Sequence, residues 1–427
     1  KPPMVIDKIN YPDDFTSMPN SSKSHTDLPS VDVVLDLIDR EVRPLTAKPT
    51  PLADALGCVL AQPVCADRDH PACDVSSIDG YAARVTEPKT RLKLAGEILP
   101  GNEPPAQIAP GEAWRIFTGA PVPVEAALVM IEDAAESGER VDFSATPSTD
   151  LIRWRGSSTQ QGATVLEAPK RISAGAISVM AAAGISQPQA IPRPRVAHIT
   201  TGREIISADQ PATAWQIRDS NSPLIRALVQ AAGADFAGHA HVGEAEAALV
   251  DAVTALPPFN VLLVSGGSSV GKYDNTAAAL EALGFEILVR RVNVRPGKPL
   301  VIARRGAQWA FGLPGNPLSH FASFHLFVLR ALCRLAGQAP TPFIKAQFTG
   351  SDPIPANPRE TFHPARIDSG DGRQPPAAIP IQWADSGDLS VLAETNGFLR
   401  VPTGQALAPG ASVAILPALG AFCFESE

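Results

Sequence analysis

A loop of small residues that begins at a buried strand and ends on a carboxylate carries the clearest chemical signal in this chain. Residues 261–264 read Val-Leu-Leu-Val, and residues 265–274 read Ser-Gly-Gly-Ser-Ser-Val-Gly-Lys-Tyr-Asp. A short apolar run is typical of a parallel strand covered on both faces, and ligands of open α/β sheets bind beyond the carboxyl ends of such strands. The backbone N–H groups of a glycine-rich turn can hold an anion. This interpretation assigns ligand contacts to Ser265, Gly266, Gly267 and Ser268.

The same loop nearly fits the phosphate-loop pattern G-x-x-x-x-G-K-[ST] of nucleoside-triphosphate enzymes. That pattern requires a short hydroxyl side chain after the lysine to hold Mg²⁺, and Tyr273 cannot place its hydroxyl there. Triphosphate hydrolysis is therefore excluded, whereas two interpretations stay open. The loop either binds another anion or is a strand-to-helix turn that uses glycine for its shape.

A second turn with anion-binding character lies further along the chain, where residues 313–317 read Leu-Pro-Gly-Asn-Pro. The turn follows an expected strand at 309–312 and precedes an apolar helix. Asn316 can cap that helix and Pro317 fits its first position, which leaves free N–H groups at the edge of the sheet. As a bare cap the turn is ordinary, but we expect it at the same sheet edge as the first loop. The predicted ligand contacts in this turn are Pro314, Gly315, Asn316 and Pro317.

A basic segment lies between the two turns. Residues 290–299 read Arg-Arg-Val-Asn-Val-Arg-Pro-Gly-Lys-Pro. In a strand, Arg291, Asn293 and Arg295 would share one face. A run of cations is most often a solvated surface. Beside two anion-binding turns, however, Arg291, Arg295 and Lys298 favour a highly negative ligand.

Carboxylates on three separate loops could complete such a site. Residues 74–82 read Asp-Val-Ser-Ser-Ile-Asp-Gly-Tyr-Ala, Glu204 follows Thr-Thr-Gly-Arg, and Asp274 closes the first loop. Oxygen ligands from several loops are what Mg²⁺ requires when it bridges phosphates. Asp74, Glu204 and Asp274 are therefore the predicted metal ligands. The turn at 74–82 also supplies the predicted binding residues Ser76, Asp79 and Gly80.

The composition favours a small partner. The chain has 427 residues, 44% of them hydrophobic, and a net charge of -8, which argues against nucleic acid or an anionic membrane as the main partner. No apolar run approaches the ~18 residues needed to cross a bilayer. The five cysteines include no C-x-x-C pair, which suits a reducing compartment. We therefore expect a cytoplasmic protein, with residues 1–29 as an extended tail.

The elements that would position these residues divide the rest of the chain into four domains. Residues 61–165 are short apolar runs broken by Pro and Gly, which is typical of a β domain. The flanking segments 30–60 and 166–193 are expected to pack as one discontinuous helical domain. Residues 194–340 alternate strand and helix, which predicts a doubly wound, mostly parallel α/β sheet. Residues 341–427 return to short apolar runs and predict a small, β-barrel-like domain.

The α/β domain has the clearest periodicity. Its expected strands are 195–199, 234–240, 260–264, 285–292 and 309–312, and its expected helices are 222–233, 243–255, 275–283 and 317–335. His239 and His241 would share one strand face, but they lack a third partner and are weak candidates for metal ligands.

Seven motifs occur in the order found in molybdopterin molybdenumtransferases, the family that includes the C-terminal enzymatic domain of gephyrin. The motifs are Asp-Val-Ser-Ser-Ile-Asp-Gly-Tyr-Ala at 74–82, Phe-Thr-Gly-Ala at 117–120, Ile-Arg-Trp-Arg-Gly at 152–156, Thr-Gly-Arg-Glu at 201–204, the loop at 265–274, Arg-Pro-Gly-Lys-Pro at 295–299 and Leu-Pro-Gly-Asn-Pro at 313–317. The chain resembles this family over nearly all residues after 30. The resemblance implies an elongated homodimer of four-domain subunits. It also implies that adenylylated molybdopterin and molybdate give molybdenum cofactor and AMP, assisted by Mg²⁺ or another divalent cation.

The resemblance also assigns roles to residues by position. Asp74 matches an acid of the β domain that reaches across the dimer interface towards the α/β domain of the partner. Thr118 matches an active-site threonine. Glu204 and Asp274 match acids near the pyrophosphate and the metal.

The basic segment matches the family in charge more closely than in residue type. Arg291 and Arg295 stand where the family usually has lysine, and a guanidinium keeps the charge and adds bidentate geometry. Lys298 matches directly. The chain departs from the family pattern at Arg203, where an acid is usual, at Glu244, and at Ser157-Ser158, where an acidic pair is common.

Two other functions stay open as alternatives. A molybdopterin adenylyltransferase would use a similar α/β domain and consume ATP, although the extra β domains weigh against it. A non-catalytic, gephyrin-like scaffold would have lost carboxylates that this chain retains. Expected protein partners are a second copy of the chain, the molybdopterin adenylyltransferase and the maturation factors of molybdenum enzymes.

Overall fold

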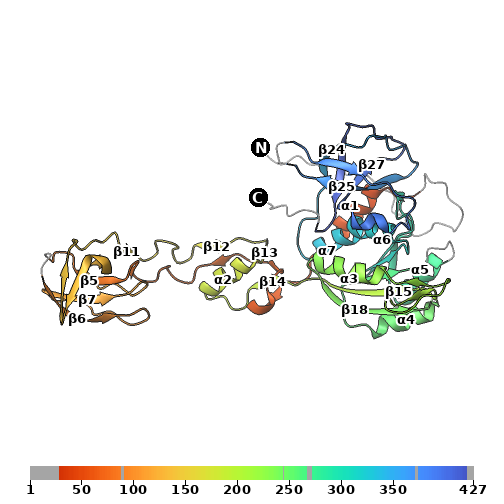
Figure 1. Ribbon diagram of the computed structural model, residues 1–427. Helices are drawn as coiled ribbons and strands as arrows, with labels where there is room; N and C mark the ends of the chain where they lie inside the picture. Colours follow the sequence, from red (N-terminus) through yellow and green to blue (C-terminus); the bar gives the residue numbers. More distant parts are fainter. Residues whose placement is uncertain (1–27, 88–90, 244, 267–271, 371–373, 421–427) are drawn as a thin grey trace, which may run out of the picture. The chain divides into compact units, whose positions relative to one another are not determined.

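The computed structural model describes residues 28–87, 91–243, 245–266, 272–370 and 374–420. It divides into two compact units, one formed by residues 46–192 and the other by residues 1–45 together with 193–427. Figure 1 shows the elements of each unit. Within the described residues, no helix has the length and apolar character needed to cross a membrane.

Part of the unit 46–192 is a small helical and β subdomain. Its four-stranded sheet has the order β1-β14-β2-β13, with β1 at Lys48–Pro49, β14 at Gln189–Ile191, β2 at Val59–Leu60 and β13 at Lys170–Arg171. The helix α2 (Ala174–Ala182) begins at Ser173, whose side chain accepts a hydrogen bond from the N–H of Ala176. Apolar residues from 55–64 and 166–190 form one core here, so the two ends of this segment pack together.

The rest of this unit is the β domain. A six-stranded sheet has the order β8-β5-β7-β6-β10-β9. The strands are β8 (Ala126–Met130), β5 (Gly80–Arg84), β7 (Glu112–Ile116), β6 (Leu92–Ile98), β10 (Arg140–Phe143) and β9 (Ala134–Ser137). Successive residues of β5 point to opposite faces, so Ala82 joins one apolar core and Tyr81 and Ala83 join the other.

The α/β sheet has six strands in the order β18-β15-β19-β23-β22-β20. They are β18 (Asp235–Val242), β15 (Arg195–Thr201), β19 (Val261–Ser265), β23 (Gln308–Leu313), β22 (Val301–Arg305) and β20 (Glu286–Val289). The first four are parallel, as predicted, whereas β22 pairs antiparallel with both β23 and β20. The strand β22 was not predicted. It forms a hairpin with β23 through Gly306, whose φ of 58° suits the tight turn.

Helices cover both faces of this sheet. Val261 and Leu263 of β19 face one core, and Leu262 and Val264 face the other. The first core is closed by α3 (Asn221–Ala231) and by a continuous helical run made of α6 (Pro317–Ser323), the π-helical turn η4 (Phe324–Val328) and α7 (Leu329–Leu335). The second core is closed by α4 (Glu246–Ala255) and α5 (Lys272–Ala282). The doubly wound prediction is therefore confirmed.

The first helix, α1 (Val31–Glu41), packs in the unit of the α/β sheet. Ser30 caps it, with its hydroxyl 3.4 Å from the N–H of Val33. Val31 and Val34 lie in the same core as the helical run at 317–335, and Arg330 Nε donates to Asp39 Oδ1 at 2.9 Å. The structure thus differs from the prediction that all of 30–60 belongs to the discontinuous domain. The reason is that the apolar face of α1 packs against the helical run at 317–335, which is distant in the sequence.

The C-terminal domain is a small closed barrel. Its strands are β24 (Ile344–Phe348), β25 (Glu360–Asp368), β26 (Ala377–Pro380), β27 (Gly397–Val401) and β28 (Ser412–Pro417). They follow the order β25-β26-β24-β28-β27, and β27 pairs with β25 to close the ring. A further short strand, β21 (Val294–Arg295), joins β25 in parallel. The basic segment is thereby fixed to the barrel.

Candidate functional site

A pocket of about 290 Å³ lies where the basic segment meets the turn after β23 and two loops of the barrel. Its walls include three cationic side chains, those of Arg295, Lys298 and Arg359. Pro314 and Asn316 contribute the turn after β23. The structure thus brings two of the three predicted cations, Arg295 and Lys298, and the predicted second turn to one place.

The indole of Trp383 forms part of the pocket wall and is held in position from behind. The guanidinium of Arg295 lies 4.9 Å from its ring centre, a cation–π distance. Trp383 Nε1 donates to His363 Nε2 at 3.2 Å, and His363 Nδ1 donates to the carbonyl of Pro364 at 2.9 Å. These two bonds fix the tautomer of a neutral imidazole. Burial lowers the pKa of His363, with a further contribution from the charge of Arg295.

The three cations repel one another. Burial lowers the pKa of Lys298, and the charges of Arg359 and Arg291 lower it further. Burial and the charge of Arg295 likewise lower the pKa of Arg359. Among the described residues, no carboxylate forms an ion pair with Arg295, Lys298 or Arg359. Such a cluster is stabilised by a bound anion, which would supply the missing counter-charge.

The prediction that Arg291, Asn293 and Arg295 share the face of one strand is wrong. Residues 290–293 follow β20 without regular strand structure, and only Val294 and Arg295 pair with the barrel. The N–H of Asn293 donates to the carbonyl of Pro29 at 2.9 Å. The exposed Arg291 does not line the pocket. Its charge nevertheless lowers the pKa of Lys298.

The carboxyl ends of β15 and β19 meet so closely that glycine is required between them. A Cβ on Gly266 would lie 2.3 Å from both the carbonyl oxygen and the hydroxyl of Thr201, at a φ of 129°. Glu204 follows β15 and is half-buried. A Cβ on Gly202 would lie 3.0 Å from each of its carboxylate oxygens, so the carboxylate lies over that glycine. Ser265 itself is buried and its hydroxyl is 2.5 Å from His198 Nε2.

The turn after β23 is held from two sides. Asn221 Nδ2 donates to the carbonyl of Gly315 at 2.8 Å, and Asn316 Nδ2 donates to Ser386 Oγ at 2.7 Å. Asn316 is the N-cap residue and Pro317 is the first residue of α6, as predicted, but the side chain of Asn316 makes no cap hydrogen bond. Its amide instead ties the turn to the barrel loop at Ser386.

In the β domain, the structure joins two of the predicted site residues. Asp79 Oδ1 accepts hydrogen bonds from the N–H of Thr118 at 2.8 Å and from its hydroxyl at 2.9 Å. The backbone bond and then the hydroxyl bond lower the pKa of Asp79, which keeps the carboxylate ionised. Asp74 lies in the preceding turn, and its Oδ1 accepts a hydrogen bond from the N–H of Arg155 at 2.8 Å.

Two other residues of this turn serve the backbone. The buried hydroxyl of Ser76 donates to the carbonyl of Ile78 at 2.7 Å. A Cβ on Gly80 would lie 2.0 Å from the carbonyl oxygen of Val129 in the paired strand β8. Ser76 and Gly80 thus shape the turn that presents Asp74 and Asp79, and their assignment as ligand contacts stays a prediction.

Several predicted positions lie outside the described residues. These are Gly267, Ser268 and Glu244, together with the side chain of Asp274 at the start of α5.

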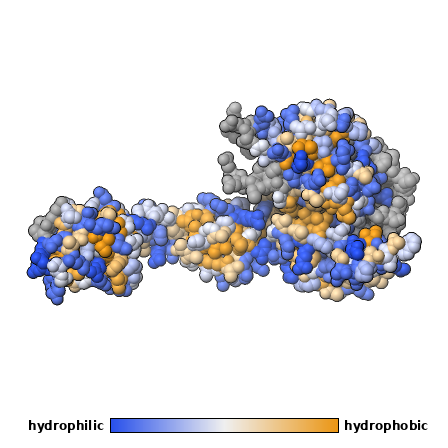
Figure 2. All heavy atoms as spheres, viewed as in Figure 1, coloured by the Kyte–Doolittle hydropathy of each residue, from blue (hydrophilic) through white to orange (hydrophobic). Residues whose placement is uncertain are grey.

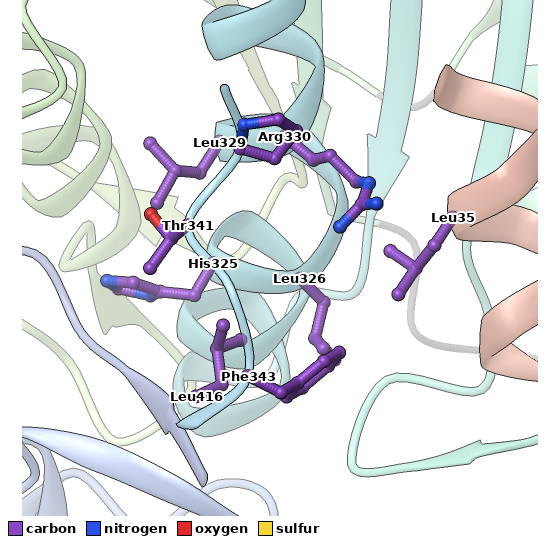
Figure 3. Close-up of a pocket in the computed structure, with 9 residues that line it drawn as sticks. Leu35, His325, Leu326, Leu329, Arg330, Thr341, Phe343 and Leu416 are labelled. Carbon is purple, nitrogen blue, oxygen red and sulfur yellow. The ribbon is translucent and has the colours of Figure 1, made fainter. Parts of the chain in front are cut away.

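A second cavity in the same unit is too small to bind a ligand. Figure 3 shows it between α1, the helical run at 317–335 and the barrel. Its volume is about 10 Å³, which is at the lower limit for one water molecule. His325 borders it and is already bonded, because its Nδ1 donates to the carbonyl of Phe321 and its Nε2 accepts from the N–H of Leu419.

Three family models match the chain in order. The MoeA N-terminal region (domain I and II) matches residues 29–184, the probable molybdopterin binding domain matches residues 197–334, and the MoeA C-terminal region (domain IV) matches residues 349–418. The molybdopterin molybdenumtransferase of a Nostoc species is 33% identical over 420 residues, covering 93% of this chain and 96% of the relative. The chain belongs to the molybdopterin molybdenumtransferase family.

Other members of this family agree. Molybdopterin molybdenumtransferase 2 of Mycobacterium tuberculosis is 32% identical over 390 residues, covering 85% of this chain and 92% of the relative. The solved structure of a molybdopterin biosynthesis MoeA protein from Pyrococcus horikoshii superposes with a TM-score of 0.71 at 25% identity, covering 91% of this chain and 99% of that one. The multidomain fold with an α/β domain and a C-terminal barrel is thus the fold of molybdopterin molybdenumtransferases.

The predicted metal ligands Asp74, Glu204 and Asp274 stay a prediction, because the side chain of Asp274 lies outside the described residues. Asp74 belongs to the unit 46–192 and Glu204 to the other unit. Among the described residues, no three side chains of His, Cys, Asp or Glu are grouped as metal ligands. His241 Nε2 instead donates to the carbonyl of Gly202 at 2.8 Å, and His239 Nε2 lies within hydrogen-bond distance of two hydroxyls. His239 and His241 thus take part in hydrogen bonds within the described residues.

Sequence reasoning missed two groups of residues. Arg359 and Trp383 line the pocket but occur outside any motif, and only the fold brings them to the basic segment. Asp219 and Ser222 form the second group, with Ser222 N donating to Asp219 Oδ1 at 2.9 Å and the two side chains 2.5 Å apart. The run Asp219-Ser-Asn-Ser-Pro223 was a usable signal, because an acid and hydroxyls before a proline are typical of a helix start.

Proposed function

We propose that this protein inserts molybdenum into molybdopterin, converting adenylylated molybdopterin and molybdate to molybdenum cofactor and AMP. The observation that carries the proposal is the pocket with three mutually repelling cations. Arg295, Lys298 and Arg359 offer a site for a doubly charged oxyanion, and molybdate is such an ion. The relatives named molybdopterin molybdenumtransferase support the same activity.

The substrate contacts follow from the neighbouring turn. The pocket opens at Pro314 and Asn316, and the ends of β15 and β19 lie along the same edge of the sheet. Backbone N–H groups at Ser265–Gly266 and in the turn at 314–316 would bind the pyrophosphate, while Arg295 and Lys298 would hold molybdate and offset the charge that develops as the adenylyl bond breaks. The Trp383 ring keeps Arg295 in place and excludes water from one side of it.

The activity is tested by incubating the full chain with adenylylated molybdopterin, molybdate and Mg²⁺. We expect AMP to be released only when molybdate is present. No release of AMP would refute the proposal, and consumption of ATP together with molybdopterin would instead identify an adenylyltransferase.

We include a divalent cation in the proposal because the motif residues Asp74, Glu204 and Asp274 supply the oxygen ligands that Mg²⁺ prefers. When bound, such an ion would neutralise charge on the pyrophosphate. Treatment with a chelator should abolish AMP release, and Mg²⁺ should restore it. Full activity in the presence of the chelator would remove the cation from the proposal.

We propose further that the protein acts as a homodimer in which Asp74 completes the site of the partner. Support comes from α2, which is apolar around its whole circumference apart from Ser178. Figure 2 shows apolar side chains gathered over this helix, and Ala174, Ala181 and Ala182 are exposed. A helix that is apolar all round is normally covered on every side.

The dimer is tested in two ways. Ala181→Glu should shift the molar mass measured by light scattering from dimer to monomer, whereas Thr164→Glu, at another exposed position of the same unit, should leave the dimer intact. A shared site is tested by mixing the inactive variants Asp74→Asn and Lys298→Ala. Random exchange of subunits should restore about a quarter of the wild-type activity, because half the dimers would carry one intact site. No recovery after verified exchange would place each site within one chain.

A further inference from the structure

Three polar side chains form a buried chain beneath the two turns that would bind the pyrophosphate. His198 on β15, Ser265 on β19 and His320 on α6 are all 0% exposed. Ser265 Oγ lies 2.5 Å from His198 Nε2 and 3.4 Å from His320 Nε2. His320 Nδ1 lies 3.0 Å from the carbonyl oxygen of Pro314. This series of hydrogen bonds therefore runs from the centre of the sheet to the turn after β23.

The hydrogen bonds have a single direction along this chain. The carbonyl of Pro314 can only accept, so His320 Nδ1 carries a proton and the Nε2 of the neutral ring is an acceptor. The hydroxyl of Ser265 donates to His320 Nε2, and His198 Nε2–H donates to Ser265. This order leaves a lone pair on His198 Nδ1, which is one of the five buried side-chain atoms that have no hydrogen-bond partner among the described residues.

Burial keeps both rings neutral, as this order requires. Desolvation lowers the pKa of His198 well below its usual value, with smaller contributions from His320 and His239. Desolvation likewise lowers the pKa of His320 to about 4. The three side chains of His198, Ser265 and His320 are therefore uncharged at neutral pH, and they interact through hydrogen bonds and not through ion pairs.

A second hydrogen-bonded group supports the same edge from the outer side. His239 Nε2 is 3.0 Å from Thr200 Oγ1 and 2.9 Å from Ser222 Oγ, and Ser222 Oγ in turn bonds to Asp219. The rings of His198 and His239 stack with centres 5.1 Å apart. The strands β18, β15 and β19 and the turn after β23 are thus joined by hydrogen-bonded side chains.

We propose that His198, Ser265 and His320 are positioning residues that set the spacing between the Ser265–Gly266 turn and the Pro314–Asn316 turn, and so fit this edge of the sheet to a pyrophosphate group. The inference rests on the proposed function for the identity of the substrate. Ser265 connects the buried side chains to the first turn, because its hydroxyl contacts both imidazoles and its backbone begins that turn. His320 holds the second turn through the carbonyl of Pro314. Neither imidazole reaches solvent, so neither touches the substrate.

The test compares Ser265→Ala and His320→Asn with a matched control. Ser265→Ala removes only the hydroxyl that joins the two rings. His320→Asn keeps a donor for the carbonyl of Pro314 but removes the acceptor for Ser265. The control is His325→Gln, which changes another fully buried histidine of the same helical run that bonds to the barrel side of the fold.

Binding of inorganic pyrophosphate to the full-length protein is measured by calorimetry, and the kinetics of AMP release are measured in parallel. We expect both test variants to bind pyrophosphate at least about 10-fold more weakly and to raise the KM for adenylylated molybdopterin, because small displacements of binding groups are costly in a preorganised site. His325→Gln should lower the melting temperature by a similar or larger amount while leaving pyrophosphate affinity and KM at wild-type values. A KM change that simply followed the loss of thermal stability would appear in all three variants.

The outcomes separate this inference from the proposed function. If the wild type releases no AMP but binds pyrophosphate, and Ser265→Ala weakens that binding, the positioning role stands and the proposed activity falls. If the wild type is active and Ser265→Ala matches it in affinity and KM, the positioning role is overturned and the activity stands. A wild type that neither binds pyrophosphate nor releases AMP overturns both.

Discussion

Arg359 gives the sharpest test of the anion pocket, because it lies outside every sequence motif and was found only in the structure. We predict that Arg359→Met weakens molybdate binding by about 30-fold. A charge-assisted hydrogen bond contributes about 1.5–3 kcal/mol, and about 2 kcal/mol corresponds to about 30-fold in Kd. The full Coulomb attraction between two unit charges at 4 Å would be larger, about 4 kcal/mol at an effective dielectric constant of about 20. The expected loss is smaller because Arg295 and Lys298 still bind the anion in the variant.

The same geometry predicts an opposite effect on the ligand-free protein. Arg359 is repelled by Arg295, and its charge in turn lowers the pKa of Lys298. Among the described residues, the only hydrogen bond of its guanidinium is a 3.5 Å contact from Nη1 to the carbonyl of Val294. Arg359→Met should therefore leave the melting temperature of the ligand-free protein unchanged or raise it. The stabilisation that the wild type gains on adding molybdate should be largely lost.

The assay is calorimetric titration with molybdate, combined with the molybdate dependence of AMP release. The matched control is Arg366→Met, which removes an equal charge from an exposed position on β25, the barrel strand that begins directly after Arg359. Equal losses of affinity in the two variants would mean that molybdate binding depends only on the net charge of the protein. Wild-type affinity in Arg359→Met would show that the pocket is not the molybdate site, and either result would refute the reasoning.

Three further predictions follow from single contacts. Gly266→Ala should unfold at least about 1 kcal/mol more easily than Gly410→Ala in urea, since both glycines have positive φ but only the Cβ at Gly266 meets backbone. His325 has its pKa lowered from 6.5 to about 4 by burial, so its stabilising contribution is complete above pH 6.5 and is lost as the pH falls towards 4. Between pH 7.5 and pH 5 this loss is about 2 kcal/mol, and His325→Gln should reduce that pH dependence in urea unfolding. Thr118→Val removes the hydroxyl bond that helps to lower the pKa of Asp79, and an NMR titration of that carboxyl should show a higher pKa. An unchanged value would mean that the backbone bond alone sets it.

The parts of the fold that follow from local patterns could be predicted from sequence. The parallel strands and their covering helices were found because strand and helix periods alternate and because Val261–Val264 is apolar on both faces. The strand β22 was missed because it ends in Arg304 and Arg305 and lies in an antiparallel hairpin, which the parallel pattern did not anticipate. The packing of α1 was missed because an amphipathic stripe does not identify which distant surface it will cover.

The site shows the same division between local and distant causes. The two turns were recognisable because each places glycine, proline and small polar residues after an apolar strand. The basic segment was taken for a strand because its side chains alternate, whereas its backbone is organised by the barrel strand that pairs with Val294 and Arg295. Gly80 and Ser76 lie in a motif with ligand character, yet one is required by a backbone approach and the other closes the turn. Residue types alone do not separate these roles.

The pocket also explains why the barrel is part of the α/β unit and not an appendage. Arg295 and Lys298 come from the segment between β20 and β22 of the sheet, Arg359 and Trp383 come from the barrel, and Asn316 bonds to the barrel loop at Ser386. Bringing three cations together is unfavourable in the absence of an anion, so the surrounding structure must supply the stabilisation. That stabilisation is available in the pairing of β21 with β25 and in the shared apolar core, where Phe398 of the barrel packs with Phe321 of α6. Without the barrel, the pocket would lose two of its walls and Arg359, one of its three cations, so the anion site depends on the contact between the two domains.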